Sequence, residues 1–133
     1  MNEELRALSL KRKKAHKTLM DLRSGTYAAF LGMEAATYRD GALSKRTKEL
    51  IAVGISVVID CRSCMQWHIE QAVADGASLR EVLEAVEVGM EMGGGPATVS
   101  ARFALDVMQE VFGQQAMTEA VALARAAGAD SAD

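Results

Sequence analysis

Hydrophobic and polar positions are interspersed along this chain in long stretches that glycine and proline seldom interrupt. Pro96 is the only proline in the sequence. Long stretches without a helix breaker favour helices over many short strands. The pattern therefore predicts an all-α fold with about six to seven helices.

Local signals set the expected helix ends. Ser44 is a candidate N-cap, and Ser78 with Glu81 has the spacing of a capping box. Gly76 is suited to end a helix, and Pro96 follows three glycines at a position typical of a helix start. The predicted helices cover residues 3–22, 27–38, 44–59, 60 or 61 to just before 76, 78–92, 96–112 and 116–127.

Residues 51–59 form an apolar run rich in β-branched side chains, which could also be a buried strand. A strand leading into a Cys-x-x-Cys helix would match the thioredoxin arrangement. We favour a helix because residues 45–50 continue into the run without a breaker and no second strand is evident. A helix that is apolar all round must be deeply buried, so in a chain of this size we expect other subunits to cover it.

Chain length and net charge indicate how many domains to expect and which kinds of partner to exclude. The 133 residues predict a single domain over 1–133, and half of them are hydrophobic, which is enough for a core. The net charge of −3 argues against a nucleic-acid partner. We interpret the basic residues within 11–17 as a solvated helix face.

Neither a secretory signal nor a membrane segment is evident. The first residues are acidic and lack an apolar core, and no apolar run approaches the roughly 18 residues of a membrane span. We therefore expect a cytoplasmic protein without a membrane partner. In a reducing compartment, a close cysteine pair is more often catalytic or metal-binding than structural.

The candidate catalytic residues are Cys61, Cys64 and His68, which include both cysteines of the chain. Their spacing puts all three on one face of the predicted fourth helix, with Cys61 in its first turn. The positive end of the helix dipole and the neighbouring Arg62 favour thiolate over thiol. His68, one turn after Cys64, could accept its proton, and two thiols at this spacing can close a disulfide.

Two other interpretations of the cysteine pair remain open from spacing alone. The cysteines could be inert apolar residues of a helical core. They could also bind zinc together with His68, although a closed structural site needs a fourth ligand and the chain has no second Cys/His pair. We predict no metal and no cofactor.

Glu49 precedes the cysteine pair and cannot be placed by helical spacing. It could be an exposed partner of Lys45 or Lys48 on its own helix. It could instead approach His68 if the third and fourth helices fold back on each other, and then orient the imidazole or accept a proton.

These residues resemble a known superfamily. The chain is similar to single-repeat members of the carboxymuconolactone decarboxylase/alkylhydroperoxidase D superfamily over about 19–112, most of the single domain. The resemblance is carried by Lys48-Glu49-Leu50-Ile51-Ala52, by Cys61-x-x-Cys64-x-x-x-His68, and by the flanks Asp40-Gly41-Ala42-Leu43-Ser44 and Met92-Gly93-Gly94-Gly95-Pro96-Ala97.

The resemblance implies an all-α fold that assembles into trimers or hexamers. It also implies that Cys64 attacks a peroxide and becomes a sulfenic acid, and that Cys61 resolves this species to a disulfide. Glu49 and His68 would form a proton relay. A dithiol, thioredoxin-type or lipoyl-type donor would then reduce the disulfide.

The superfamily has two branches. The decarboxylase branch acts on a lactone and does not depend on a cysteine pair, so the two cysteines here favour the redox branch. Some peroxidase relatives carry a second histidine between the cysteines, where this chain has Arg62 and Ser63. Because both cysteines are present, we expect a thiol–disulfide oxidoreductase that reduces peroxides. A lactone-processing enzyme and a non-catalytic redox-sensing oligomer are the alternatives.

Overall fold

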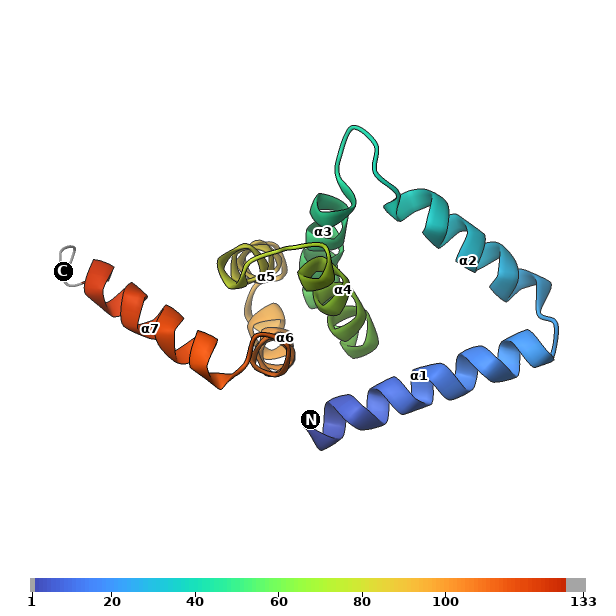
Figure 1. Cartoon of the computed structure of the whole chain (residues 1–133), viewed down its shortest axis with the longest axis horizontal. Helices are drawn as coiled ribbons and strands as arrows, with labels where there is room; N and C mark the ends of the chain where they lie inside the picture. Colours follow the sequence, from blue (N-terminus) through green and yellow to red (C-terminus); the bar gives the residue numbers. More distant parts are fainter. Residues whose placement is uncertain (1, 129–133) are drawn as a thin grey trace.

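The structure is a computed structural model that describes residues 2–128, which form helices and connecting turns without any strand. This confirms the all-α prediction, and Figure 1 shows the arrangement. The helices are α1 (Glu3–Asp21), α2 (Gly25–Tyr38), α3 (Lys45–Val58), α4 (Arg62–Ala74), α5 (Leu79–Gly93), α6 (Gly95–Phe112) and α7 (Gln114–Gly128).

The expected helix signals are present in the structure. Ser44 is the N-cap of α3, and its side chain accepts a hydrogen bond from the Thr47 amide. Ser78 and Glu81 form a reciprocal capping box at the start of α5. Pro96 is the second residue of α6, one position later than expected. The apolar run 51–59 belongs to helix α3 and the turn after it, so the strand alternative is wrong.

The hydrophobic core lies among α3, α4, α5 and α6, and Leu5 of α1 packs against it. Fully buried side chains from each of the four helices face one another there. They are Val53 and Val57 of α3, Met65 and Ile69 of α4, Val82 and Val86 of α5, and Ala104, Val107 and Met108 of α6. This core fixes α3 beside α4, which is the helix pair that carries the candidate site.

Helices α3 and α5 approach each other closely because glycine occupies their contact. A Cβ atom added to Gly89 would lie 2.6 Å from the Gly54 carbonyl oxygen and 2.9 Å from the Val57 Cβ atom. Real Cβ atoms do not approach backbone this closely, so a side chain at position 89 would push the helices apart. Gly89 therefore sets the distance between α3 and α5.

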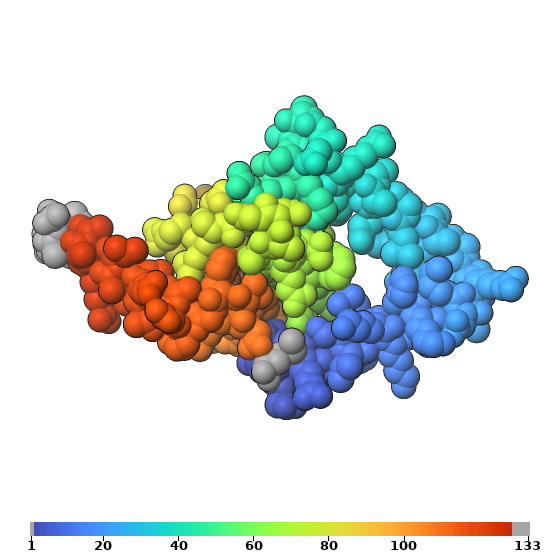
Figure 2. Space-filling view, viewed as in Figure 1, coloured from blue at the N-terminus to red at the C-terminus, as the bar shows by residue number. Residues whose placement is uncertain are grey.

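Helices α1, α2 and α7 lie outside this body. Figure 1 shows α1 and α2 as an arm on one side and α7 projecting on the other. In Figure 2 an opening separates the arm from the body along part of its length. α1 is anchored by buried Leu5 and by Gln66, whose side-chain amide donates to the Leu5 carbonyl. α2 and α7 contain no buried residue.

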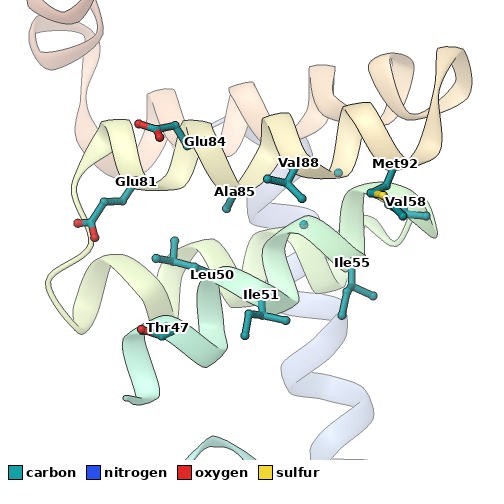
Figure 3. A pocket seen from close by; sticks show the side chains of 12 residues that line it. Thr47, Leu50, Ile51, Ile55, Val58, Glu81, Glu84, Ala85, Val88 and Met92 are labelled. Carbon is teal, nitrogen blue, oxygen red and sulfur yellow. The ribbon is translucent and has the colours of Figure 1, made fainter. Parts of the chain in front are cut away.

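One side of α3 remains exposed within a single chain, so burial of residues 51–59 all round would depend on the other subunits that we expect to cover them. Ile51, Ile55 and Val58 are exposed, and Val88 and Met92 of α5 continue this surface. Figure 3 shows these side chains along a groove of about 670 Å³ between the two helices. We call these five residues the apolar face. Its covering by another subunit stays a prediction.

Across residues 2–128, each helix is too short or too polar to serve as a membrane span.

Candidate active site

The turn between α3 and α4 places the first cysteine. α3 ends in a Schellman-type motif, in which the Asp60 amide donates to the Val57 carbonyl and the Cys61 amide donates to the Ser56 carbonyl. Asp60 adopts the left-handed conformation with φ 55°, which aspartate tolerates better than most residues. The Ser100 hydroxyl donates to the Asp60 carboxylate at 2.9 Å and thereby ties this turn to α6.

Cys61 and Cys64 are joined by a disulfide at the N-terminus of α4, with Cα atoms 5.2 Å apart. Cys61 is the N-cap residue rather than a residue of the first turn, and its sulfur accepts a hydrogen bond from the Cys64 amide at 3.2 Å. The expectation that Cys61 lies on a face of the helix is therefore corrected by one position. Both sulfurs still lie at the positive end of the helix dipole.

Glu49 and His68 form the central polar pair of the site. The Nδ1 atom of His68 lies 2.6 Å from Oε2 of Glu49, which joins α4 to α3. Glu49 is 2% exposed, so the alternative that it is an exposed surface carboxylate is wrong. A buried carboxylate is costly unless it is paired, and His68 provides one of its partners. The two residues meet because α3 and α4 fold back on each other.

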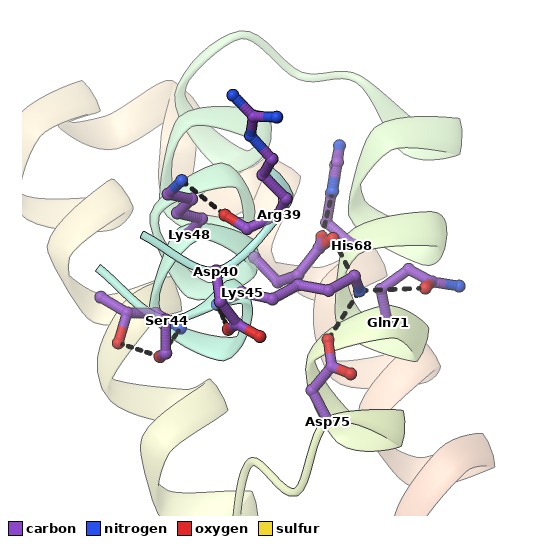
Figure 4. Close-up of polar contacts among 10 residues, drawn as sticks. Arg39, Asp40, Ser44, Lys45, Lys48, His68, Gln71 and Asp75 are labelled. Carbon is purple, nitrogen blue, oxygen red and sulfur yellow. Dashed lines mark hydrogen bonds and ion pairs between the residues drawn. The ribbon is translucent and has the colours of Figure 1, made fainter. Parts of the chain in front are cut away.

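Lys45 provides the second partner of Glu49. Its ammonium lies 3.3 Å from Oε1 of Glu49 and 2.6 Å from the carboxylate of Asp75, and it also contacts Gln71. Figure 4 shows the Lys45 side chain reaching from α3 to Gln71 on α4 and to Asp75, the residue that follows α4. Lys48, the other lysine considered for Glu49, instead donates to the Arg39 carbonyl at 2.7 Å.

Tyr38 covers the imidazole from α2. The ring centroids of Tyr38 and His68 lie 5.2 Å apart, with the rings tilted by 32°. Burial raises the pKa of Tyr38 above its ordinary value, and the nearby charges of Glu49 and Glu34 raise it further. Tyr38 therefore stays a neutral phenol at neutral pH. Sequence reasoning missed it, because nothing in the local pattern shows that α2 returns to α4.

A small pocket of about 200 Å³ opens beside the pair, between α2, α3 and α4. Its lining combines aromatic rings with charged groups. The lining residues are Glu34, Ala35, Tyr38, Arg39, Lys45, Glu49, Trp67 and Gln71. The pocket therefore gives access to Glu49 from the side of α2.

The arrangement defines what His68 can do. If Nδ1–H donates to the Glu49 carboxylate, Nε2 is the nitrogen that can accept a proton. His68 lies one helical turn after Cys64 on α4, at the spacing where side chains meet. In the disulfide state no hydrogen bond joins His68 to Cys64 among the described residues. The expected contact between them stays a prediction for the reduced state.

A zinc site would need Cys61, Cys64 and His68 as ligands. Within residues 2–128, no three His, Cys, Asp or Glu side chains are grouped so that they could hold a metal ion. The two sulfurs are bonded to each other, and His68 is turned to Glu49.

Two solved structures are similar to this chain. One is a carboxymuconolactone decarboxylase family protein from Legionella pneumophila, with 28% identity and a TM-score of 0.78 over 83% of this chain and 98% of that chain. The other is a Thermotoga maritima family protein for which involvement in an antioxidative response has been suggested. It shows 27% identity and a TM-score of 0.72 over 78% of this chain and 88% of that one.

Sequence relatives agree with this likeness. The chain is 41% identical over 85 residues to uncharacterized protein 4 in the cox locus of Paracoccus denitrificans, covering 64% of this chain and 77% of the relative. Residues 25–107 match the model of the carboxymuconolactone decarboxylase family. This match includes the cysteine pair, Glu49 and His68, and it confirms the resemblance seen in the motifs. The chain therefore belongs to the carboxymuconolactone decarboxylase family.

Proposed function

We propose that this protein is a thiol–disulfide oxidoreductase that reduces peroxides through Cys64 and Cys61. One observation carries the proposal. The Cys61–Cys64 disulfide lies at the N-terminus of α4, and His68 lies one turn after Cys64 on the same helix. The His68 imidazole is hydrogen-bonded to the buried carboxylate of Glu49. Dithiol redox catalysis requires at least a pair of thiols and a nearby proton acceptor.

The cycle starts when a dithiol donor reduces the disulfide, so that the donor becomes a disulfide and the protein carries two thiols. The Cys64 thiolate then attacks the peroxide ROOH, the O–O bond breaks, and Cys64–SOH and ROH form once a proton reaches the leaving oxygen. The Cys61 thiol attacks Cys64–SOH, water leaves, and the disulfide is restored. The oxidant is the peroxide, and the electrons come from the donor.

His68 and Glu49 serve this cycle as a proton relay. His68 accepts the Cys64 proton at Nε2, and the Glu49 carboxylate stabilises the imidazolium that forms. The same proton then protonates the leaving alkoxide or hydroxide. Cys61, at the N-cap outside the helix, suits the resolving role and the exchange with the donor.

The relatives support this assignment without defining the substrate. An antioxidative role has been suggested for the Thermotoga maritima structure, and peroxide reduction would provide such a role. A dithiol, thioredoxin-type or lipoyl-type protein is the class of donor that such a disulfide requires. A reducing compartment such as the cytoplasm would supply it.

The test is peroxide consumption with a panel of dithiol donors, comparing the wild type with Cys64→Ser and Cys61→Ser. We expect turnover in the wild type only, with single-turnover peroxide reduction retained in Cys61→Ser. A lactone of the carboxymuconolactone type is assayed in parallel by its absorbance. Lactone loss that survives Cys64→Ser, without peroxide turnover, would replace the proposal with the decarboxylase alternative. A reversible disulfide with neither activity would favour a redox sensor.

A further inference from the structure

Glu49 has two carboxylate oxygens, and the proton relay uses only one. Oε2 faces His68, whereas Oε1 faces the ammonium of Lys45, one turn earlier on α3. The Glu49 side chain is 3% exposed, so water contributes little to solvating its charge. Lys45 therefore joins His68 in stabilising the Glu49 carboxylate.

Lys45 is held in place from the opposite helix. An ammonium has three hydrogen-bond donors, and Lys45 has three acceptors within reach, in Glu49, Gln71 and Asp75. The Asp75 contact is the shortest at 2.6 Å, and the two acceptors on α4 and at its end hold the ammonium in the space between the helices. An unanchored lysine, by contrast, would extend into solvent.

Lys45 stays positively charged at neutral pH, because its pKa is raised. The hydrogen bond to Asp75 raises the pKa of Lys45 above its ordinary value, and the Glu49 charge raises it further, although burial acts in the opposite direction. Other polar groups face the pair from every helix packed around it. They are Glu34, Tyr38 and Arg39 from α2 and its end, and Gln71 and Asp75 from α4 and its end.

We propose that Lys45 is a positioning residue of the relay, which keeps Glu49 as a carboxylate and so leaves His68 as the group that exchanges the proton. The proposal rests on the proposed function, because it assigns Lys45 to the same relay. The physical reason is that a buried carboxylate and an imidazole compete for protons. A fixed positive charge on the carboxylate side makes the pair release a proton more readily.

Removing the Lys45 charge should shift the pKa values of nearby acids in one direction. Without Lys45, every acid nearby holds its proton more tightly, including the His68 imidazolium and the Cys64 thiol. The acid limb of Cys64 reactivity should therefore move to higher pH. A residue that only supported the fold would change stability and leave this limb in place.

The experiment uses full-length reduced protein in a Cys61→Ser background, so that Cys64 is the only thiol. Alkylation of Cys64 by iodoacetamide is followed as a function of pH. Lys45→Met is compared with Lys45→Arg, which keeps the charge, and with Lys48→Met, which removes a lysine of the same helix that does not contact Glu49. Circular dichroism confirms the fold. Lys45→Gln is a second neutral variant in case Lys45→Met does not fold.

We expect the acid limb of Lys45→Met to move up by less than about one pH unit, because shifts of one unit or more are typical of a charge within 4–6 Å. Cys64 lies about two helical turns before Gln71, which Lys45 contacts. Lys45→Arg and Lys48→Met should retain the wild-type limb. Imidazole ¹⁵N spectra at pH 7 give a second readout, in which the neutral variant should show more protonated Nε2 on His68, while His16 serves as the internal reference.

Coincident limbs and unchanged His68 spectra for Lys45→Met and the parent protein would overturn the proposal. An equal shift in Lys48→Met would also overturn it, since the effect would then be one of net charge. Neither readout requires peroxide. If the wild type fails to reduce peroxides, the proposed function fails, and the alkylation and ¹⁵N results still decide whether Lys45 controls the Glu49–His68 pair.

Discussion

The two sides of helix α3 depart from the usual burial pattern in opposite ways: one side buries a charged residue, and the other exposes apolar residues. One side buries a charged residue, Glu49, together with Val53 and Val57. The other side leaves Ile51 and Ile55 about half exposed. A buried carboxylate is tolerated where partners are built around it, and an exposed apolar stripe indicates a surface that binds something. We therefore propose that the side of α3 that faces α4 serves chemistry and that the exposed side along the groove serves association.

The largest expected effect concerns the chemical side. His68→Ala removes the proton acceptor and leaves Glu49 without one of its partners, so sulfenic acid formation on Cys64 should slow by about 10–1000-fold. The rate is measured by stopped-flow mixing of reduced protein with peroxide. His16→Ala, which changes the only other histidine, is the matched control. Equal rates for the His68 variant and the wild type would remove the relay from the mechanism.

The next prediction concerns the apolar face. We expect the wild type to be a homo-oligomer, because Ile55 and its neighbours would be covered by another copy. The family resemblance implies a trimer or hexamer. Ile55→Asp would place a charge in that contact and should shift the mass toward the 14.2 kDa monomer. Light scattering at micromolar concentration provides the measurement.

The control for the apolar face is Leu123→Asp, which puts the same charge on an exposed apolar position of α7, away from the groove. This variant should keep the wild-type mass. A wild-type protein that is a stable monomer at micromolar concentration contradicts the assignment of this side of α3 to association.

A smaller effect is expected where the two helices of the apolar face cross. Gly89→Ala adds a Cβ atom against the Gly54 carbonyl and Val57, which should lower the free energy of unfolding by about 1–3 kcal/mol. Gly32→Ala on α2 has nothing within 4 Å and should leave stability unchanged or raise it slightly. Urea unfolding distinguishes the two. Equal midpoints for both variants would show that the crossing can relax.

The smallest effect concerns Glu81 at the rim of the groove. The backbone hydrogen bond from Ser78 lowers the pKa of Glu81 below its ordinary value. Its charge therefore stabilises the fold above the ordinary glutamate range, and this contribution disappears as pH falls through the lowered pKa. Glu81→Gln should be slightly less stable than the wild type at pH 7 and equal to it in acid. Glu84→Gln is the control, and a pH-independent difference would contradict the assignment.

Local signals in the sequence are sufficient to predict several helix starts and the cysteine pairing of this structure. Capping depends on residues within one turn of each other, which is why Ser44 and the Ser78–Glu81 box marked the starts of α3 and α5. The pairing of Cys61 with Cys64 is equally local. Cys61 was misplaced by one position because a Schellman turn centred on an aspartate, Asp60, lacks the usual glycine signal.

The remaining features depend on contacts between helices. The 2.6 Å contact of Glu49 with His68 exists because α3 and α4 pack antiparallel around the core, and spacing within one helix does not encode that. The positions of Tyr38 over the imidazole and of Asp75 beside Lys45 have the same origin. The apolar run of α3 predicts burial all round, but sequence alone does not show which side α4, α5 and α6 cover and which side is left for another subunit.

The central claim is that Cys64 is the attacking thiol and Cys61 the resolving one. Dimedone labelling of fully reduced variants after one equivalent of peroxide, located by mass spectrometry, tests it most directly. We expect an adduct on Cys64 in the Cys61→Ser protein and no adduct in the Cys64→Ser protein. An adduct on Cys61 in the Cys64→Ser protein would reverse the roles, and the absence of an adduct in both variants would contradict peroxide chemistry at this site.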